Sequence, residues 1–102
     1  MATAPLTYHR RARWTLEELP ASEQKEIRAA VNSLVNLPPD RWPSDRVHLI
    51  DPVKARYMLL ATPDWRVFFT RSTLGEIEIT VIMHEETIRA FHSAESGSDR
   101  EE

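Results

Sequence analysis

Hydrophobic positions recur at helical spacing in the first third of the chain. After His9, Ala12, Leu16 and Leu19 stand at i, i+4 and i+7, which places them on one face of a helix. We therefore expect a helix over 9–19. Pro20 follows directly and separates this helix from the next, since proline lacks an amide hydrogen and disfavours helix in the residue before it.

A second amphipathic helix is predicted after Ser22, which is a good N-cap residue. Glu23 and Glu26 fall in its first turn, where the helix dipole favours acidic groups. The apolar residues then follow a helical stripe up to Pro38-Pro39, namely Ile27, Ala30, Val31, Leu34 and Leu37. Two helices joined by a short turn predict an αα-hairpin with one shared apolar face.

The second half of the chain alternates short apolar runs with turn residues. Runs at 56–61, 64–69 and 76–83 are separated by Thr62-Pro63 and by Ser72–Gly75, which predicts three antiparallel strands in a meander. Val47–Ile50 predicts a further short strand before them. The segment Met1–Thr7 is either a disordered leader or contributes a strand around Leu6–Tyr8, and the sequence leaves both open.

Alternation along the predicted strands divides their side chains between two faces. In the last strand we expect Ile77, Ile79, Val81 and Met83 to share the face that receives the helices. The central strand divides in the same way, with Trp65, Val67 and Phe69 on one face and Arg66, Phe68 and Thr70 on the other. The second, mixed face is the predicted functional surface.

His84–Phe91 predicts a short final helix whose Ile88 and Phe91 dock on the body of the domain. The segment 93–102 has the composition of a disordered acidic tail. The fold class expected is therefore α+β: an N-terminal helical hairpin packed on a small antiparallel meander, with a short C-terminal helix. All of it forms a single domain over 1–92.

Composition excludes several kinds of chemistry. The chain has 102 residues, no cysteine and four scattered histidines, so disulfides are excluded and a structural zinc site is not expected. No cofactor is expected either. No apolar run reaches the ~20 residues of a membrane span, and no secretory segment is evident at the N-terminus. We expect a soluble cytoplasmic protein with no membrane partner.

Charge is unevenly distributed along the chain. The net charge is −3, and the tail 93–102 accounts for all of it with four acids and one arginine, so the rest of the chain is neutral. Arg10, Arg11 and Arg13 form a basic cluster beside His9. Such a cluster suits either a nucleic-acid partner or an ordinary solvated helix face.

Three motifs in this order resemble the RelE/ParE superfamily of toxins from type II toxin–antitoxin systems. They are the strand Tyr57-Met58-Leu59, the strand Asp64-Trp65-Arg66-Val67, and the apolar run Ile79–Met83 followed by His84 and by the aromatic Phe91. The helical first half, with its Leu-Pro phrase between two helices, is similar to the family's helical hairpin. The resemblance covers residues 8–91 and implies the same fold.

The chain also departs from the pattern of members that cut mRNA. Met58 and Leu60 stand where those members carry basic side chains, and Glu85 follows the histidine where a basic residue is usual. Phe91 lacks the hydroxyl of the family's tyrosine. Arg66 is the family's basic position that is kept, and the resemblance implies that it contacts phosphate, for which a planar cation with bidentate reach is suited.

If the chain cleaves RNA without a metal, it needs an acid, a base and cations for the developing phosphorane charge. The candidates are Arg66 and Arg56 as cations and His84 and His48 for proton transfer. Each has a structural alternative: His84 as a residue at a strand-to-helix junction, Arg66 as an ion-pair partner of Glu78, and the other two as surface groups.

The resemblance implies three alternative functions. The first is a RelE-like mRNA endonuclease acting on the ribosome, the second a ParE-like toxin that inhibits DNA gyrase without cleaving nucleic acid, and the third an inactive relative that keeps the fold for binding. For all three we expect a cognate antitoxin docked between the helical hairpin and the sheet, and self-association is possible. Trp14 and Trp42, outside the core stripes, are candidate exposed anchors for a partner.

Overall fold

The computed structural model describes residues 6–90. Its elements run in the order β1 (Leu6–Tyr8), α1 (Arg10–Glu17), α2 (Ala21–Val35), a 3₁₀ turn η1 (Pro39–Arg41), β2 (Val47–Asp51), β3 (Arg56–Leu60), β4 (Trp65–Arg71) and β5 (Ile77–His84). Residues 85–90 are helical and leave the end of β5. The predicted helical hairpin, the meander and the strand before it are all confirmed.

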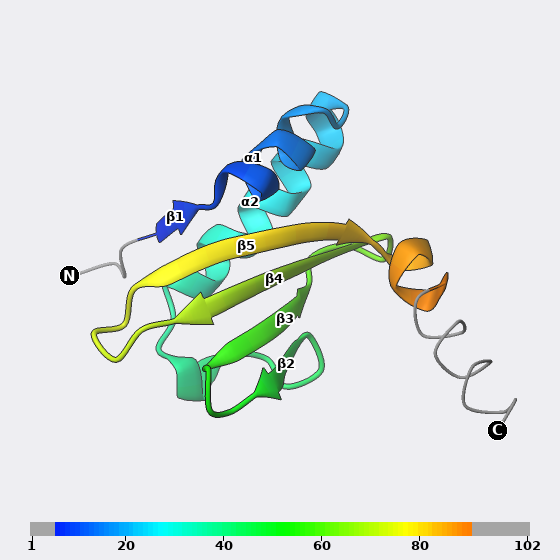
Figure 1. Cartoon of the computed structure of the whole chain (residues 1–102). Helices are drawn as coiled ribbons and strands as arrows, with labels where there is room; N and C mark the ends of the chain where they lie inside the picture. Colours follow the sequence, from blue (N-terminus) through cyan, green and yellow to red (C-terminus); the bar gives the residue numbers. More distant parts are fainter. Residues whose placement is uncertain (1–5, 91–102) are drawn as a thin grey trace, which may run out of the picture.

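The five strands form one sheet in the order β1-β5-β4-β3-β2 (Figure 1). Consecutive strands from β2 to β5 pair antiparallel, and β1 pairs with β5 in parallel. The parallel pairing is possible because the helical hairpin and the other three strands form the long connection that it requires. It also settles the open alternative at the N-terminus: residues 6–8 form a strand.

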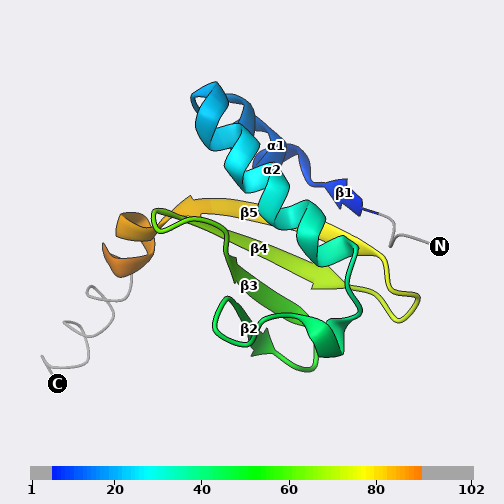
Figure 2. The same cartoon turned by 180° about the vertical axis from the view of Figure 1, so that it is seen from behind.

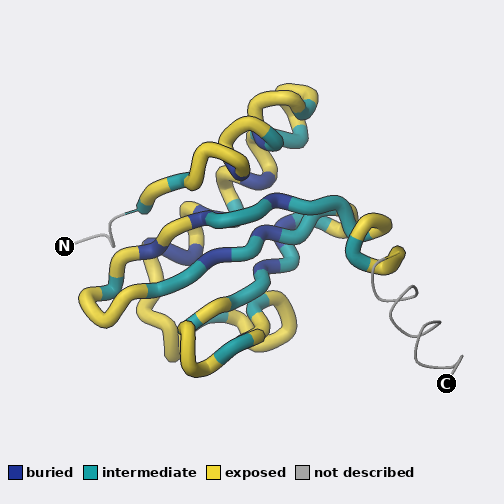
Figure 3. The backbone as a smooth tube through the Cα atoms, in the orientation of Figure 1, coloured by how far each residue is buried: buried dark blue, intermediate teal, exposed yellow. Residues whose placement is uncertain are grey.

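Both helices of the hairpin lie on one side of the sheet (Figure 2). The core between them is apolar throughout, and Figure 3 shows its buried positions in the helices and in the central strands. The helices contribute Ala12, Leu16, Ile27, Val31, Leu34 and Val35, and the strand segments contribute Leu59, Ala61, Val67, Phe69, Ile77, Ile79 and Ile82. The predicted helical stripes supply most of the helices' core residues, and Leu19 and Ala30 are partly buried against this core. Leu37 is 40% exposed, against the prediction, and Val35 is buried although it was not in the predicted stripe.

The junction between the helices differs in detail from its prediction. His9 Nδ1 accepts a 3.1 Å hydrogen bond from the amide of Arg11, so a histidine caps α1. The second helix starts at Ala21 with Pro20 as its N-cap, and Ser22 lies inside the first turn. Gln24 connects the two helices, because its Nε2 donates to the carbonyl of Leu19 in the turn at 2.8 Å and to that of Glu17, the last residue of α1, at 3.3 Å.

The face assignment of β5 was wrong for its second half. The register slips between Phe68 and Phe69, which pair with Val81 and Ile79, so Thr80 is an extra residue in β5. Such a β-bulge reverses the alternation beyond it. Ile82 is therefore in the core at 4% exposure. Val81 and Met83 lie on the opposite face, beside Phe68 and Arg66.

Trp42 is not an exposed anchor. Its ring packs edge-on against Tyr57 and Phe69, with centroids 5.2 and 5.5 Å away, and the core covers part of it. Its Nε1 donates to the carbonyls of Leu34 and Leu37 at 3.1 and 3.2 Å. The Leu34 carbonyl lies in the last turn of α2 and also accepts from the amide of Leu37, which follows the helix. Trp42 thus ties the C-terminal end of α2 to the core.

Phe91 and the tail 93–102 lie outside the described residues, and their predicted docking and disorder stay predictions. Within the described part of the chain, no helix combines the length and the hydrophobicity that crossing a membrane requires.

Candidate functional site

The sheet face opposite the helices is uncovered by any element between residues 6 and 90, and we call it the open face (Figures 1 and 2). Its side chains follow from the strand register and form three cross-strand rows. The rows are His48–Met58–Phe68–Val81, Leu60–Arg66–Met83 and Arg56–Thr70–Glu78. The centre of this face is apolar and half-buried, and its charged groups lie around that centre.

Arg66 projects from β4 onto the open face and is held at the β3–β4 turn. Its NH1 donates to the carbonyls of Thr62 and Pro63 at 2.9 and 3.2 Å. The turn itself is fixed by the Thr62 hydroxyl, whose oxygen accepts from the amides of Asp64 and Trp65. Glu78 pairs with Thr70, four residues along the strand from Arg66, so register gives no support to the alternative Arg66–Glu78 ion pair.

His84 faces the other side of the sheet. It pairs with Trp65, whose ring it meets edge-on at a centroid distance of 4.9 Å. Its Nδ1 accepts a 3.1 Å hydrogen bond from the amide of Glu86, so the imidazole caps the helix over 85–90. The sequence placed Arg66 and His84 in one site, and the structure places their side chains on opposite faces.

Arg56 and His48 both lie on the open face and are exposed. Arg56 is in the row of Thr70, and His48 is in the row of Phe68. Strand spacings put the Cα atoms of His48 and Arg66 about 12 Å apart, with Met58 and Phe68 between them. A ligand whose phosphate binds Arg66 can thus reach the His48 imidazole only if it extends across the apolar centre of the open face.

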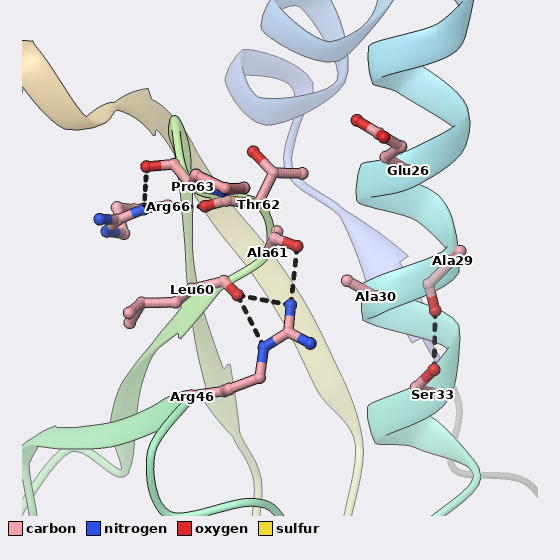
Figure 4. A pocket seen from close by; sticks show the side chains of 10 residues that line it. All are labelled: Glu26, Ala29, Ala30, Ser33, Arg46, Leu60, Ala61, Thr62, Pro63 and Arg66. Atoms are coloured by element: carbon pink, nitrogen blue, oxygen red, sulfur yellow. Dashed lines mark hydrogen bonds between the residues drawn. The ribbon is translucent and has the colours of Figure 1, made fainter.

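A groove of about 680 Å³ runs between α2 and the β3–β4 hairpin. Its helix wall carries the small side chains Ala29, Ala30 and Ser33, and its other wall is the backbone of residues 60–63. Figure 4 shows that Arg46 points into the space between these walls, whereas Arg66 points away from α2. A groove thus lies between the hairpin and the sheet, and the docking of an antitoxin there stays a prediction.

Arg46 is the member of this groove that the sequence did not single out. Its NH2 donates to the carbonyls of Leu60 and Ala61 at 2.9 and 2.8 Å, and its Nε also reaches the Leu60 carbonyl at 3.2 Å. The guanidinium thereby satisfies the carbonyls at the end of β3 and adds a positive charge to the groove. No sequence signal beyond a basic residue before a strand pointed to it.

Trp14 is exposed, as predicted, with 59% of its surface accessible. Arg10 from the preceding turn lies over its ring, 6.0 Å from the centroid, in a cation–π contact. The basic cluster of α1 is thus partly engaged by its own tryptophan. No cluster of three or more potential metal ligands from His, Cys, Asp and Glu occurs within residues 6–90.

Comparison with known proteins finds a likeness in structure alone. No protein-family model matches the sequence, and no curated protein matches it significantly. Among solved structures, the chain is similar to RelE of the archaeal RelE–RelB complex from Pyrococcus horikoshii OT3, with a TM-score of 0.67 and 19% identity over 81% of this chain and 96% of that one. It is also similar to the toxin–antitoxin complex RelBE2 from Mycobacterium tuberculosis, with a TM-score of 0.62 and 14% identity over 83% and 94%. The chain therefore has the fold of a RelE-type toxin.

Proposed function

We propose that this protein is the toxin component of a type II toxin–antitoxin module. The observation that carries the proposal is the fold, which matches RelE-type chains from two toxin–antitoxin complexes over four fifths of this chain. The retained Arg66 on the open face supports it. A cognate antitoxin is accordingly its partner.

The groove beside α2 is the place we assign to the antitoxin. Its wall of Ala29, Ala30 and Ser33 carries only small side chains, so that another helix can approach α2 closely. Arg46 at the rim favours an acidic residue on the incoming segment. Binding here does not depend on the identity of the toxin's target, although Leu60 and Arg66 belong both to the groove lining and to the open face.

The activity we assign first is RelE-like cleavage of mRNA on the ribosome. Three of the four candidate residues, Arg66, Arg56 and His48, share the open face and can serve one extended substrate. In this assignment the two arginines neutralise phosphate charge and His48 moves the proton of the 2′-hydroxyl. His84, a helix cap on the other face, is given a structural role.

A second candidate activity is inhibition of a protein target such as DNA gyrase, as in ParE. The apolar centre of the open face favours it, because Met58, Leu60, Phe68, Val81 and Met83 form a contiguous patch on an uncovered surface. Methionine-rich patches adapt readily to a protein partner.

Induction of the protein alone in a bacterial host tests the toxin assignment. We expect growth arrest by the native protein and recovery with Arg66→Ala, whose fold is checked by circular dichroism. Arg71→Ala is the matched control, because it removes an arginine from the same strand on the other face. Normal growth with a folded native protein would overturn the assignment.

A further inference from the structure

One aromatic side chain, Phe68, occupies the middle of the open face between two arginines. Arg66 stands two residues before it on β4, and Arg56 on β3 pairs with Thr70, two residues after it. Strand geometry puts each arginine roughly 7–8 Å from Phe68, measured between Cα atoms. Phe68 is half-buried by its neighbours in the sheet and lies outside the core.

The neighbours of Phe68 flank its ring and leave part of the side chain accessible. Met58 and Val81 flank it on the adjacent strands, and both are half-buried apolar residues. The bulge at Thr80 produces this arrangement, because it turns Val81 out of the core and onto the open face. The Thr80 hydroxyl donates to the Phe68 carbonyl at 3.1 Å and fixes the bulge against the strand that carries the ring.

A ring on an uncovered sheet, with cations on both sides, suits a single-stranded nucleic acid. Unpaired bases stack on aromatic side chains, and stacking tolerates any sequence because every base has a π-face. Guanidinium groups bind phosphate with bidentate geometry. A folded protein partner would need neither the two cations nor their placement along the strand direction.

We propose that the open face binds single-stranded RNA in the absence of the ribosome, with a nucleobase stacked on Phe68 and neighbouring phosphates bound by Arg66 and Arg56. This rests on the proposed use of the open face for the target. It adds a binding residue and a mode of binding in which stacking replaces the basic side chains that Met58 and Leu60 do not supply.

The charges around the ring make this binding only weakly dependent on salt. Arg66 and Arg56 are the two arginines beside Phe68, while Glu78 lies in the row of Arg56 and Asp51 pairs with Arg56. The Asp51 carboxylate is partly engaged, since it accepts from the amides of Val53 and Lys54. Two phosphate contacts on a single strand give a slope of log K against log salt of about −1.4.

Fluorescence anisotropy with a short 2′-O-methyl RNA, which cannot be cleaved through the 2′-hydroxyl, measures this binding directly. We expect Phe68→Leu to weaken it by roughly 5- to 150-fold with an unchanged salt slope, since stacking alone is lost. Phe68→Trp retains binding. Arg66→Ala lowers the magnitude of the slope by about 0.7. Equal urea midpoints show that the variants are folded.

Trp14 beside Arg10 is the rival aromatic and basic cluster, so Trp14→Leu is made in parallel and is expected to bind RNA like the native protein. Binding lost in Trp14→Leu and kept in Phe68→Leu would overturn the inference. A native protein that arrests growth without binding the RNA would also overturn the inference, and it would leave the toxin assignment intact. RNA binding without growth arrest would support the inference and overturn the toxin assignment.

Discussion

Trp65 Nε1 donates a 2.6 Å hydrogen bond to Glu23 Oε1, 42 residues away in the sequence. This bond joins the start of β4 to the first turn of α2, and so joins the sheet to the helix that forms one wall of the groove. The Trp65 ring also meets His84 at the end of β5. The Trp65 indole thus contacts both α2 and the end of β5, the two elements beside the β3–β4 turn that holds Arg66.

We expect Trp65→Phe to lower the free energy of unfolding by about 1–2 kcal/mol, because it keeps an aromatic ring and removes the bond to Glu23. Urea denaturation measures the change. Glu23→Gln, which retains an acceptor oxygen, should cost less. A double-mutant cycle with no coupling between the two positions would show that the bond does not stabilise the fold.

Trp42→Phe tests the closure of α2 in the same way. The substitution keeps the edge contacts to Tyr57 and Phe69 and removes the donor to the Leu34 and Leu37 carbonyls. A loss of about 1 kcal/mol is expected, together with faster amide exchange in the last turn of α2. Unchanged exchange there would mean that water replaces the indole at no cost.

The helix cap at His84 can be separated from proton transfer by choice of substitution. His84→Ala should lower stability by about 1 kcal/mol, and His84→Asn should restore most of it, because asparagine caps helices well. We expect His84→Asn to arrest growth like the native protein. A stable His84→Asn variant without toxicity would return His84 to the list of catalytic groups.

Tyr8 gives the fold a dependence on alkaline pH. Burial of this β1 residue raises the pKa of its hydroxyl above the ordinary value of 10.0, although the charge of Arg28 acts in the opposite direction. The unfolded chain therefore loses this proton at lower pH than the folded one, and stability falls as pH rises through 10 and beyond. Tyr8→Phe should flatten that fall in urea midpoints measured between about pH 9 and 11. An equally steep fall in both proteins would assign the effect to other groups.

Most of the fold could be predicted from the sequence, because the signals that define its helices and strands act between residues close together in the chain. Helical stripes such as Leu16 and Ile27, and the breaks at Pro20 and Pro63, act within a few residues. The face of Ile82 was not available in this way. A single extra residue at Thr80 reverses the alternation, and nothing in an unbroken apolar run marks where a bulge falls.

The sequence predicted which side chains of β4 share the outer face, but not how the four candidate residues are arranged around it. Alternation along β4 placed Arg66 and Phe68 together on the outer face, which the structure confirms. The orientation of His84 depends on a helix that starts one residue later and needs a cap. Arg46 depends on carbonyls of a strand fourteen residues away, a relationship that only tertiary structure defines.

Mapping of transcript 5′ ends after induction of the native protein and of Arg66→Ala, Arg56→Ala and His48→Ala tests the proposed activity most directly. We expect growth arrest with new ends in phase with codons for the native protein, and loss of those ends in the Arg66→Ala and His48→Ala variants. Growth arrest without new transcript ends would contradict RNA cleavage and would favour a protein target that binds the open face.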